Sequence, residues 1–272
     1  MSQLKVGAST FCLLGQPVRQ AVESLLDLGF AAIELFGDSP QAHYTQLNPG
    51  DRRFLRVAGS RCELSVHAPV FEVNIASANP CSQEEAVRQY REAVYLAAEI
   101  GATRLVVHEG HMSYWKLDRR LALQAARHGL GEVLALARQM DVAIALENTN
   151  FGKFAMYETW QEWAELATFL APSGEAGLCL TLDVGHARLA GWDLPGLIHG
   201  LAPRIAQLHV HDTSGVADDH LAPGDGVVDW PGIRLALADS GCAASLILEH
   251  GPLESSEELR KAKGWLDRWS AV

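Results

Sequence analysis

The stretch Leu178-Cys179-Leu180-Thr181-Leu182-Asp183 is a short apolar run that ends in a carboxylate. Seven further runs rich in Val, Ile and Leu recur along the chain, separated by loops and by segments with helical periodicity. The eight runs are residues 4–8, 31–36, 64–66, 105–107, 142–146, 178–182, 205–210 and 246–248. Short strands without polar alternation, separated by amphipathic helices, predict a parallel sheet covered by helices. Eight such units favour a closed barrel over an open sheet.

We therefore expect an α/β fold in which residues 1–272 form a single (β/α)8 TIM barrel domain. The 272 residues agree with the usual size of this barrel, about 250 residues. With 48% hydrophobic residues the chain can bury a large core, and no low-complexity stretch or linker divides it. A dinucleotide-binding fold loses its main support, because Gly15 stands alone where a Gly-x-Gly-x-x-Gly turn is needed.

Helix signals occur between the runs. Pro17 suits the start of a first helix, which Gly29 ends. Ser82-Gln83-Glu84-Glu85 predicts a capping box before a helix over 86–100, which Gly101 ends. Leu and Ala alternate with Arg and Gln at helical spacing over 117–140, which predicts another helix.

The composition restricts partners and compartment. The chain has 33 acidic and 22 basic side chains, a formal net charge of −11, which argues against a surface that follows a nucleic-acid backbone. A small phosphorylated substrate is not excluded. No apolar run approaches the roughly 18 residues of a membrane span, and the first residues lack a signal-peptide pattern, so we expect a cytoplasmic protein without membrane contact. The scattered cysteines fit reduced thiols rather than a disulfide framework; they are Cys12, Cys62, Cys81, Cys179 and Cys242.

Six consecutive predicted strands end on a His, Asp or Glu. These residues are His67, His108, Glu147, Asp183, His209 and Glu249. One polar residue at a strand end is usually only a solvated cap, but a closed barrel points all six at one mouth. Converging carboxylates and imidazoles need a cation to offset their repulsion and desolvation, and they are ligand types for divalent metals. The pattern predicts a metal site.

Several segments give this pattern a family resemblance. They are His67-Ala68-Pro69, Leu146-Glu147-Asn148-Thr149, Asp183-Val184-Gly185-His186-Ala187 running to Ala190-Gly191-Trp192-Asp193, and Asp218-Asp219-His220 followed by Pro223-Gly224-Asp225-Gly226. With these segments nearly the whole chain resembles the xylose isomerase-like TIM barrel superfamily. That superfamily contains sugar isomerases and epimerases as well as the endonuclease IV type of apurinic-site nuclease.

The resemblance implies a ligand set. The core metal ligands shared by both branches would be Glu147, Asp183, His209 and Glu249. Three carboxylates and one imidazole form an oxygen-rich site, for which we expect Mn²⁺ or Zn²⁺, with Mg²⁺ and Co²⁺ as alternatives. The endonuclease branch adds two groups for further ions, with Glu147 bridging. These additional positions are His67 and His108 for a second ion, and His186, Asp218 and His220 for a third.

Other polar residues stay open at this point. His209 and His211 share one face of their strand, and only the family pattern selects His209. Glu109, His111 and Asp212 are expected to be hydrogen-bonding partners of ligands or solvated loop residues. The remaining histidines are expected to be structural or on the surface; they are His43, His128, His199 and His250.

The main functional hypothesis is a metal-dependent isomerase or epimerase of a small sugar or related hydroxy-ketone. Such a reaction moves a proton next to a carbonyl through a metal-stabilised enediolate. By the resemblance, Glu147 and Glu249 would carry the proton, and His186 would bind or polarise a substrate oxygen. Loop aromatic residues are candidates for stacking on a sugar ring; they are Trp115, Phe151, Trp192 and Trp230.

Two alternatives remain. One is a trinuclear-zinc phosphodiesterase acting on abasic DNA, which the ligand set supports and the charge opposes. The expected βα loops contain few cations (Arg56, Arg61, Lys116, Lys153 and Arg188), and the loop after the seventh strand is acidic (Asp212, Asp218, Asp219, Asp225 and Asp229). Val70 also stands where the nuclease branch usually has an aromatic residue. The other alternative is a non-catalytic sugar or metal binder. The sequence leaves open the substrate and its phosphorylation, the number of metal ions and whether the chain forms a homo-oligomer.

Overall fold

The computed structural model describes residues 4–172, 177–253 and 255–270. Eight parallel strands form a closed barrel in chain order, and β8 pairs with β1 to complete the ring. The strands are β1 (Val6–Ser9), β2 (Ala32–Phe36), β3 (Glu63–His67), β4 (Arg104–His108), β5 (Ala143–Glu147), β6 (Leu178–Asp183), β7 (Ile205–Val210) and β8 (Ser245–Leu248). Each strand overlaps one of the eight apolar runs, so the predicted (β/α)8 TIM barrel is confirmed.

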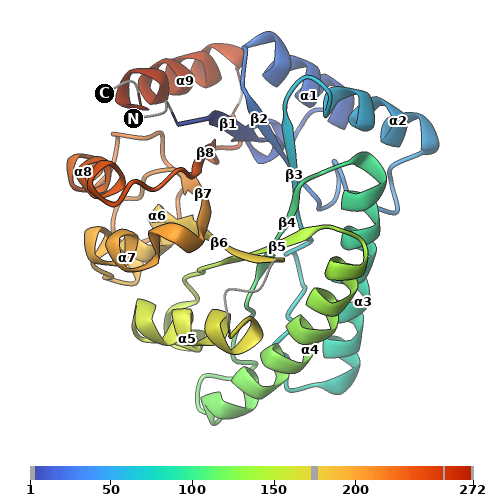
Figure 1. The fold of residues 1–272 in the computed structure, drawn as a ribbon, viewed down its shortest axis with the longest axis vertical. Helices are drawn as coiled ribbons and strands as arrows, with labels where there is room; N and C mark the ends of the chain where they lie inside the picture. The colour runs from blue at the N-terminus through green and yellow to red at the C-terminus, as the bar shows by residue number, and fades with distance from the viewer. Residues whose placement is uncertain (1–3, 173–176, 254, 271–272) are drawn as a thin grey trace.

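Helices surround the ring of strands (Figure 1). The α-helices of the described residues are α1 (Val18–Asp27), α2 (Pro49–Ala58), α3 (Pro80–Ile100), α4 (Arg119–Gln139), α5 (Trp160–Leu170), α6 (Val184–Leu189), α7 (Leu194–Leu201), α8 (Trp230–Ser240) and α9 (Ser256–Ser270). Short 3-10 helices are η1 (Thr10–Leu13), η2 (Gly152–Phe154) and η3 (Ala202–Arg204). The connection from β6 to β7 contains both α6 and α7, so His186 lies in an extra helix directly after β6.

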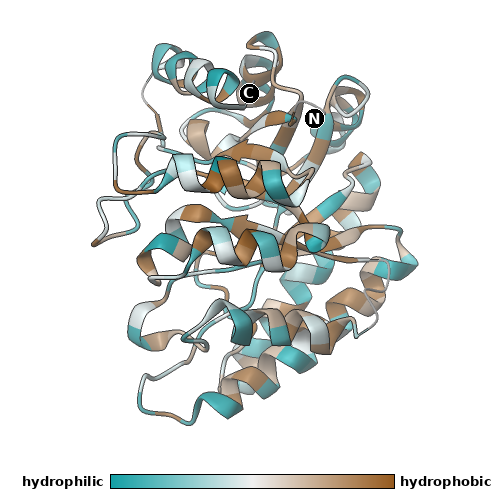
Figure 2. Ribbon diagram, turned by 60° about the vertical axis from the view of Figure 1, so that its left-hand side comes forward, coloured by the Kyte–Doolittle hydropathy of each residue, from teal (hydrophilic) through white to brown (hydrophobic). Residues whose placement is uncertain are grey.

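The core lies between the strands and the inward faces of the helices. Figure 2 shows hydrophobic strands inside and hydrophilic residues concentrated on the outer helix faces. The largest fully buried side chains include Trp163 of α5 and Tyr90 of α3. No helix among the described residues combines the length and the apolarity needed to cross a membrane.

Helix α3 begins one turn earlier than the capping box at Ser82 predicts. Asn79 is the N-cap, and its Oδ1 accepts a hydrogen bond from the Cys81 amide at 3.1 Å. Pro80 follows as the first helical residue, where its fixed φ suits the helix and its missing N–H costs nothing. The helix therefore starts at the asparagine cap followed by proline, and the predicted capping box at Ser82 was wrong.

The long loop between β7 and α8 is organised by one buried carboxylate, Asp212. Its Oδ1 accepts hydrogen bonds from the Thr213 and Val228 amides at 2.9 and 3.0 Å. Its Oδ2 accepts from the Gly224 amide at 3.0 Å and from Nε1 of Trp230 at 2.8 Å. Asp212 thus ties both ends of the loop together, and this loop carries two of the predicted ligands.

Candidate metal centre

All nine predicted metal positions come together at the C-terminal mouth of the barrel. Four of them end strands: His67 ends β3, His108 ends β4, Glu147 ends β5 and Asp183 ends β6. His209 lies one residue before the end of β7. Glu249 follows β8, and His186 lies in α6. Asp218 and His220 come from the loop that Asp212 organises. The parallel register brings residues far apart in the sequence into one cluster, which is buried except at Asp218 and in part at His108 and His220.

The cluster divides into overlapping groups whose ligand atoms lie within 4.8 Å of one another. The first group contains the four predicted core ligands, Glu147, Asp183, His209 and Glu249. The second contains His67, His108 and Glu147, and a further combination joins His67, His209 and Glu249. The last contains His186, Asp218 and His220 together with His211.

Glu147 occupies the centre of the cluster, with 1% of its surface exposed. Its Oε2 lies 3.0 Å from Nε2 of His67 and 3.3 Å from Nε2 of His108. Its Oε1 lies 3.1 Å from Nδ1 of His209, and that same nitrogen lies 2.9 Å from Oε2 of Glu249. The Glu147 carboxylate therefore faces both the group of His67 and His108 and the core group, as a ligand that bridges two ions would.

In four of these histidines a backbone carbonyl faces Nδ1. A carbonyl oxygen can only accept a hydrogen bond, so a ring that binds a metal through Nε2 keeps its hydrogen at Nδ1. The Nδ1–oxygen distances are 2.8 Å in His67, 3.1 Å in His186, 3.3 Å in His211 and 2.6 Å in His220. A neutral ring of this tautomer presents a lone pair at Nε2.

The Nε2 atoms of these four rings point at carboxylate oxygens. The closest distances are 3.0 Å from His67 to Glu147, 3.0 Å from His186 to Asp218, 2.9 Å from His211 to Asp183 and 3.5 Å from His220 to Asp218. Two acceptors at such distances repel unless a second proton or a cation lies between them. The residues therefore fit a metal centre: imidazole lone pairs and carboxylates are the donor set that divalent ions need.

In the ion-free protein, protons would take the place of the cation. Burial disfavours a charged ring, but the hydrogen bond and negative charge of Glu147 outweigh it and raise the pKa of His67 to about 9. Burial is likewise outweighed at His220, where Asp218 and Glu249 raise the pKa to about 9. For Glu147 the neighbouring histidines outweigh burial and hold the pKa well below its usual range. The cluster consequently has carboxylates ready to bind a cation at neutral pH.

Glu34 of β2 is a buried partner of the cluster that the sequence reasoning missed. Its Oε1 lies 2.9 Å from Nε2 of His209, on the side of the ring away from Glu147. Its Oε2 accepts hydrogen bonds from Nε2 of Gln207 at 2.7 Å and from Oγ of Ser65 at 3.0 Å. Nε2 of His209 thus lies between Glu34 and the side-chain amide of Gln207, at 2.9 and 3.2 Å, and this position turns Nδ1 toward the cluster. A lone carboxylate within an apolar strand was the signal that could have identified Glu34.

His211 also points into the cluster and is fully buried. The spacing of His209 and His211 predicts that they share a strand face, and the structure brings both rings to the mouth. The resemblance selects only His209 as a ligand. Its side chain is nevertheless one of the four donors in the group with His186.

Glu109 and Asn148 stabilise the strand ends. Oε1 of Glu109 accepts hydrogen bonds from the Thr149 amide and hydroxyl at 3.2 and 2.7 Å, and burial raises the pKa of Glu109 to about 7. Asn148 pairs with the backbone of Asp183 in both directions, at 2.8 and 2.9 Å. These bonds join β4 to β5 and β5 to β6 at the level of the ligands.

Two of the four aromatic candidates lie at the rim. The ring of Phe151 lies 4.4 Å from that of His111, and Trp115 lines a cavity of about 490 Å³ with Lys153. Trp230 is buried and hydrogen-bonds Asp212, so it cannot stack on a substrate. Trp192 packs against Trp163 and the hydrophobic core.

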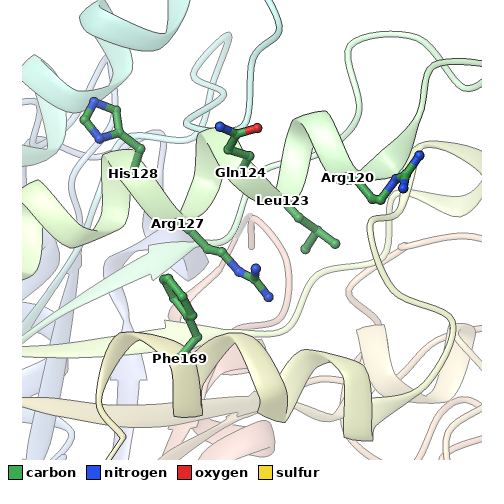
Figure 3. Close-up of a pocket in the computed structure, with 6 residues that line it drawn as sticks. All are labelled: Arg120, Leu123, Gln124, Arg127, His128 and Phe169. Atoms are coloured by element: carbon green, nitrogen blue, oxygen red, sulfur yellow. The ribbon is translucent and has the colours of Figure 1, made fainter.

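A second surface hollow, with a volume of about 620 Å³, lies outside the mouth of the barrel (Figure 3). It is lined by side chains of α4 and α5, among them Arg127, whose guanidinium lies 4.4 Å from the ring centre of Phe169. None of the nine predicted metal positions lines it.

Comparison with known proteins supports the same fold. The profile of the xylose isomerase-like TIM barrel family matches residues 22–269. A protein named probable endonuclease 4 from Mycobacterium leprae (strain Br4923) is 30% identical over 243 residues, which cover 86% of this chain and 88% of that protein. A crystal structure of a D-tagatose 3-epimerase-like protein superposes with a TM-score of 0.82 and 23% identity, covering 98% of this chain and 97% of that one. The IOLI protein, whose structure contains a zinc atom, superposes with a TM-score of 0.80 and 16% identity, covering 98% of this chain and 97% of that one. The chain therefore belongs to the family of xylose isomerase-like TIM barrels.

Proposed function

We propose that this protein is a divalent-metal-dependent isomerase or epimerase of a small sugar or a related hydroxy-ketone. The observation that carries the proposal is the convergence of Glu147 and Glu249 on one nitrogen. Their carboxylate oxygens lie 3.1 and 2.9 Å from Nδ1 of His209, although they come from β5 and from the end of β8. Two carboxylates that reach one point from different sides of a mouth can flank a substrate.

The core ion would be held by Glu147, Asp183, His209 and Glu249. When bound, a divalent ion acts as a Lewis acid that stabilises the negative oxygen of an enediolate. Glu147 and Glu249 would hold and return the proton at the carbon next to the carbonyl, one from each face in an epimerisation. His186 lies beside this group, where it would contact a substrate oxygen or bind a further ion. Both glutamates are almost fully buried, which excludes bulk water from the proton transfer.

The metal would be Mn²⁺ or Zn²⁺. Three carboxylates in the core group favour Mn²⁺, and Mg²⁺ or Co²⁺ would also suit them. The group around His186 is richer in imidazole, which favours Zn²⁺.

A zinc phosphodiesterase of the endonuclease IV type is the second candidate. The assembly of all nine positions supports it, as does the relative named probable endonuclease 4. Charge opposes it more strongly than the sequence indicated. Arg56 lies in α2 and bonds the Glu99 carbonyl, while Arg61 lies in the turn before β3, so neither is in a βα loop. We place a small-molecule substrate first and nucleic acid second.

The deciding experiment measures bound metal by elemental analysis alongside deuterium exchange from solvent into a panel of ketoses. We expect exchange, and we expect Glu147→Gln and Glu249→Gln each to lower its rate at least about 100-fold. Glu63→Gln is the matched control, because Glu63 begins β3 at the opposite end of the barrel. Nicking of abasic DNA without ketose exchange would replace this proposal by the phosphodiesterase. Metal binding with neither activity would leave the non-catalytic binder.

A further inference from the structure

We propose that His211 is a metal ligand that closes the group around His186 into a zinc site with four protein donors. This inference rests on the proposed metal centre and adds a ligand that neither the core set nor the endonuclease set contains. The donors are His186, His211, Asp218 and His220, whose ligand atoms all lie within 4.8 Å of one another.

His211 can offer Nε2 to a metal while its hydrogen stays at Nδ1, which lies 3.3 Å from the carbonyl oxygen of Asp212. Nε2 lies 2.9 and 3.0 Å from the two oxygens of Asp183, so a hydrogen or a cation has to lie at this nitrogen. The ring is fully buried, so bulk water cannot relieve this contact. A cation beside Nε2 would relieve it.

The rings of His211 and His220 are stacked, with centroids 4.0 Å apart and planes at 15°. Both rings direct Nδ1 at a backbone carbonyl, which leaves Nε2 of each ring as its available ligand atom. His186 approaches edge-on, with its ring centroid 5.8 Å from that of His211 and 6.3 Å from that of His220. Asp218 faces both His186 and His220. Three imidazoles and a carboxylate thus lie within reach of one another, and binding one ion through all four requires the stacked rings of His211 and His220 to tilt toward it.

Gly185 makes room for the His211 ring. A Cβ atom at position 185 would lie 2.1 Å from Cε1 of His211, far inside contact distance. The first turn of α6 therefore accommodates this ring only because residue 185 has no side chain. The local sequence Asp183-Val184-Gly185-His186 thus supplies one ligand and the space for another.

With four protein donors, this ion would be structural and not catalytic. Structural zinc sites have four protein ligands, whereas catalytic zinc sites keep a position open for water or substrate. An ion held by all four residues would fasten the β7–α8 loop, through Asp218 and His220, to α6 and β7. It would not bind substrate, and His186 would be a ligand instead of a group that polarises substrate.

The test uses the full chain, freed of metal by a chelator and titrated with ZnCl2 and with CoCl2. We expect three zinc ions per chain in the wild type and two in His211→Asn, because one site loses more than about 100-fold in affinity. Losing only a hydrogen-bonding partner of a ligand costs about 10- to 100-fold. His111→Asn is the matched control, since His111 is at the same mouth but in none of the ligand groups. It should bind three ions.

Cobalt gives a second readout that needs no variant. We expect the strong visible absorption of one tetrahedral Co²⁺ per chain to remain unchanged by added azide, because a closed site offers no position to an anion. This measurement decides the question if His211→Asn fails to fold.

Three outcomes would overturn the proposal. The first is His211→Asn with three ions at affinities within about 100-fold of the wild type, which would make His211 a hydrogen-bonding partner of Asp183. The second is a wild type with only one ion, and the third is a spectrum without tetrahedral Co²⁺. These three leave the proposed isomerase or epimerase standing. A wild type that binds no metal would overturn both proposals.

Discussion

Nε2 of His209 lies 2.9 Å from Oε1 of Glu34, on the side of the ring opposite the candidate core site. This contact fixes which nitrogen faces Glu147 and Glu249. We expect Glu34→Leu to lower the metal affinity of the core site about 10- to 100-fold, because the ring loses its orienting acceptor. Glu34→Gln keeps an acceptor oxygen and should retain most of the affinity. Calorimetric titration of metal into protein freed of metal by a chelator checks both variants. Equal metal affinities of Glu34→Leu and the wild type would show that Glu34 does not orient His209.

Gly185 and Gly131 should respond oppositely to alanine. A Cβ at Gly185 would meet the His211 ring at 2.1 Å, so Gly185→Ala should destabilise the fold by about 1–3 kcal/mol. Gly131 lies within α4 with no atom within 4 Å of an added Cβ, so Gly131→Ala should stabilise the fold by about 0.5–1 kcal/mol. Urea unfolding measures both. If Gly185→Ala leaves the free energy of unfolding unchanged, the His211 ring is free to move away from residue 185.

The sequence predicted the barrel well because strand patterning is local. Each run of Val, Ile and Leu predicts one strand from its own residues. Once the strands pair in parallel, their carboxyl ends lie at the same mouth of the barrel. The nine ligand positions follow from those ends and from the family resemblance. Glu34 could not be found in this way, because its partner His209 is many residues away and the pairing depends on side-chain direction inside the barrel. The role of His211 likewise depends on Gly185, which belongs to another strand end.

Acid should weaken the ion pairs of Glu63 with Lys5 and Arg104, at the end of the barrel opposite the metal cluster. Burial disfavours the Glu63 carboxylate, but Lys5 and Arg104, at 2.6 and 2.7 Å, outweigh it and hold its pKa below the usual value. A depressed carboxyl pKa stabilises the fold above the unfolded pKa, about 4.3, and the benefit is lost as pH falls through the folded pKa.

We therefore expect Glu63→Gln to cost up to about 1 kcal/mol at pH 7 and progressively less below about pH 4. Denaturant unfolding of both proteins between pH 3 and pH 7 measures the difference. A gap that stays constant with pH would show that the charge of Glu63 contributes nothing.

Removing metal should lower the stability of the whole fold. A ligand present at 100 times its dissociation constant stabilises the native state by about 2.7 kcal/mol for each independent site. Chelation should accordingly lower the thermal midpoint, and added Zn²⁺ or Mn²⁺ should restore it. Calorimetry with and without chelator checks this, and an unchanged midpoint would count against any ion in the cluster.

The order of the ligands along the chain has a consequence for biosynthesis. His67, His108 and Glu147 are all present once β5 has been made, whereas the core group waits for Glu249 after β8. The two groups share Glu147, so the earlier one is available to an ion while the later one is still incomplete. The core site can therefore be filled only when the ring of strands closes.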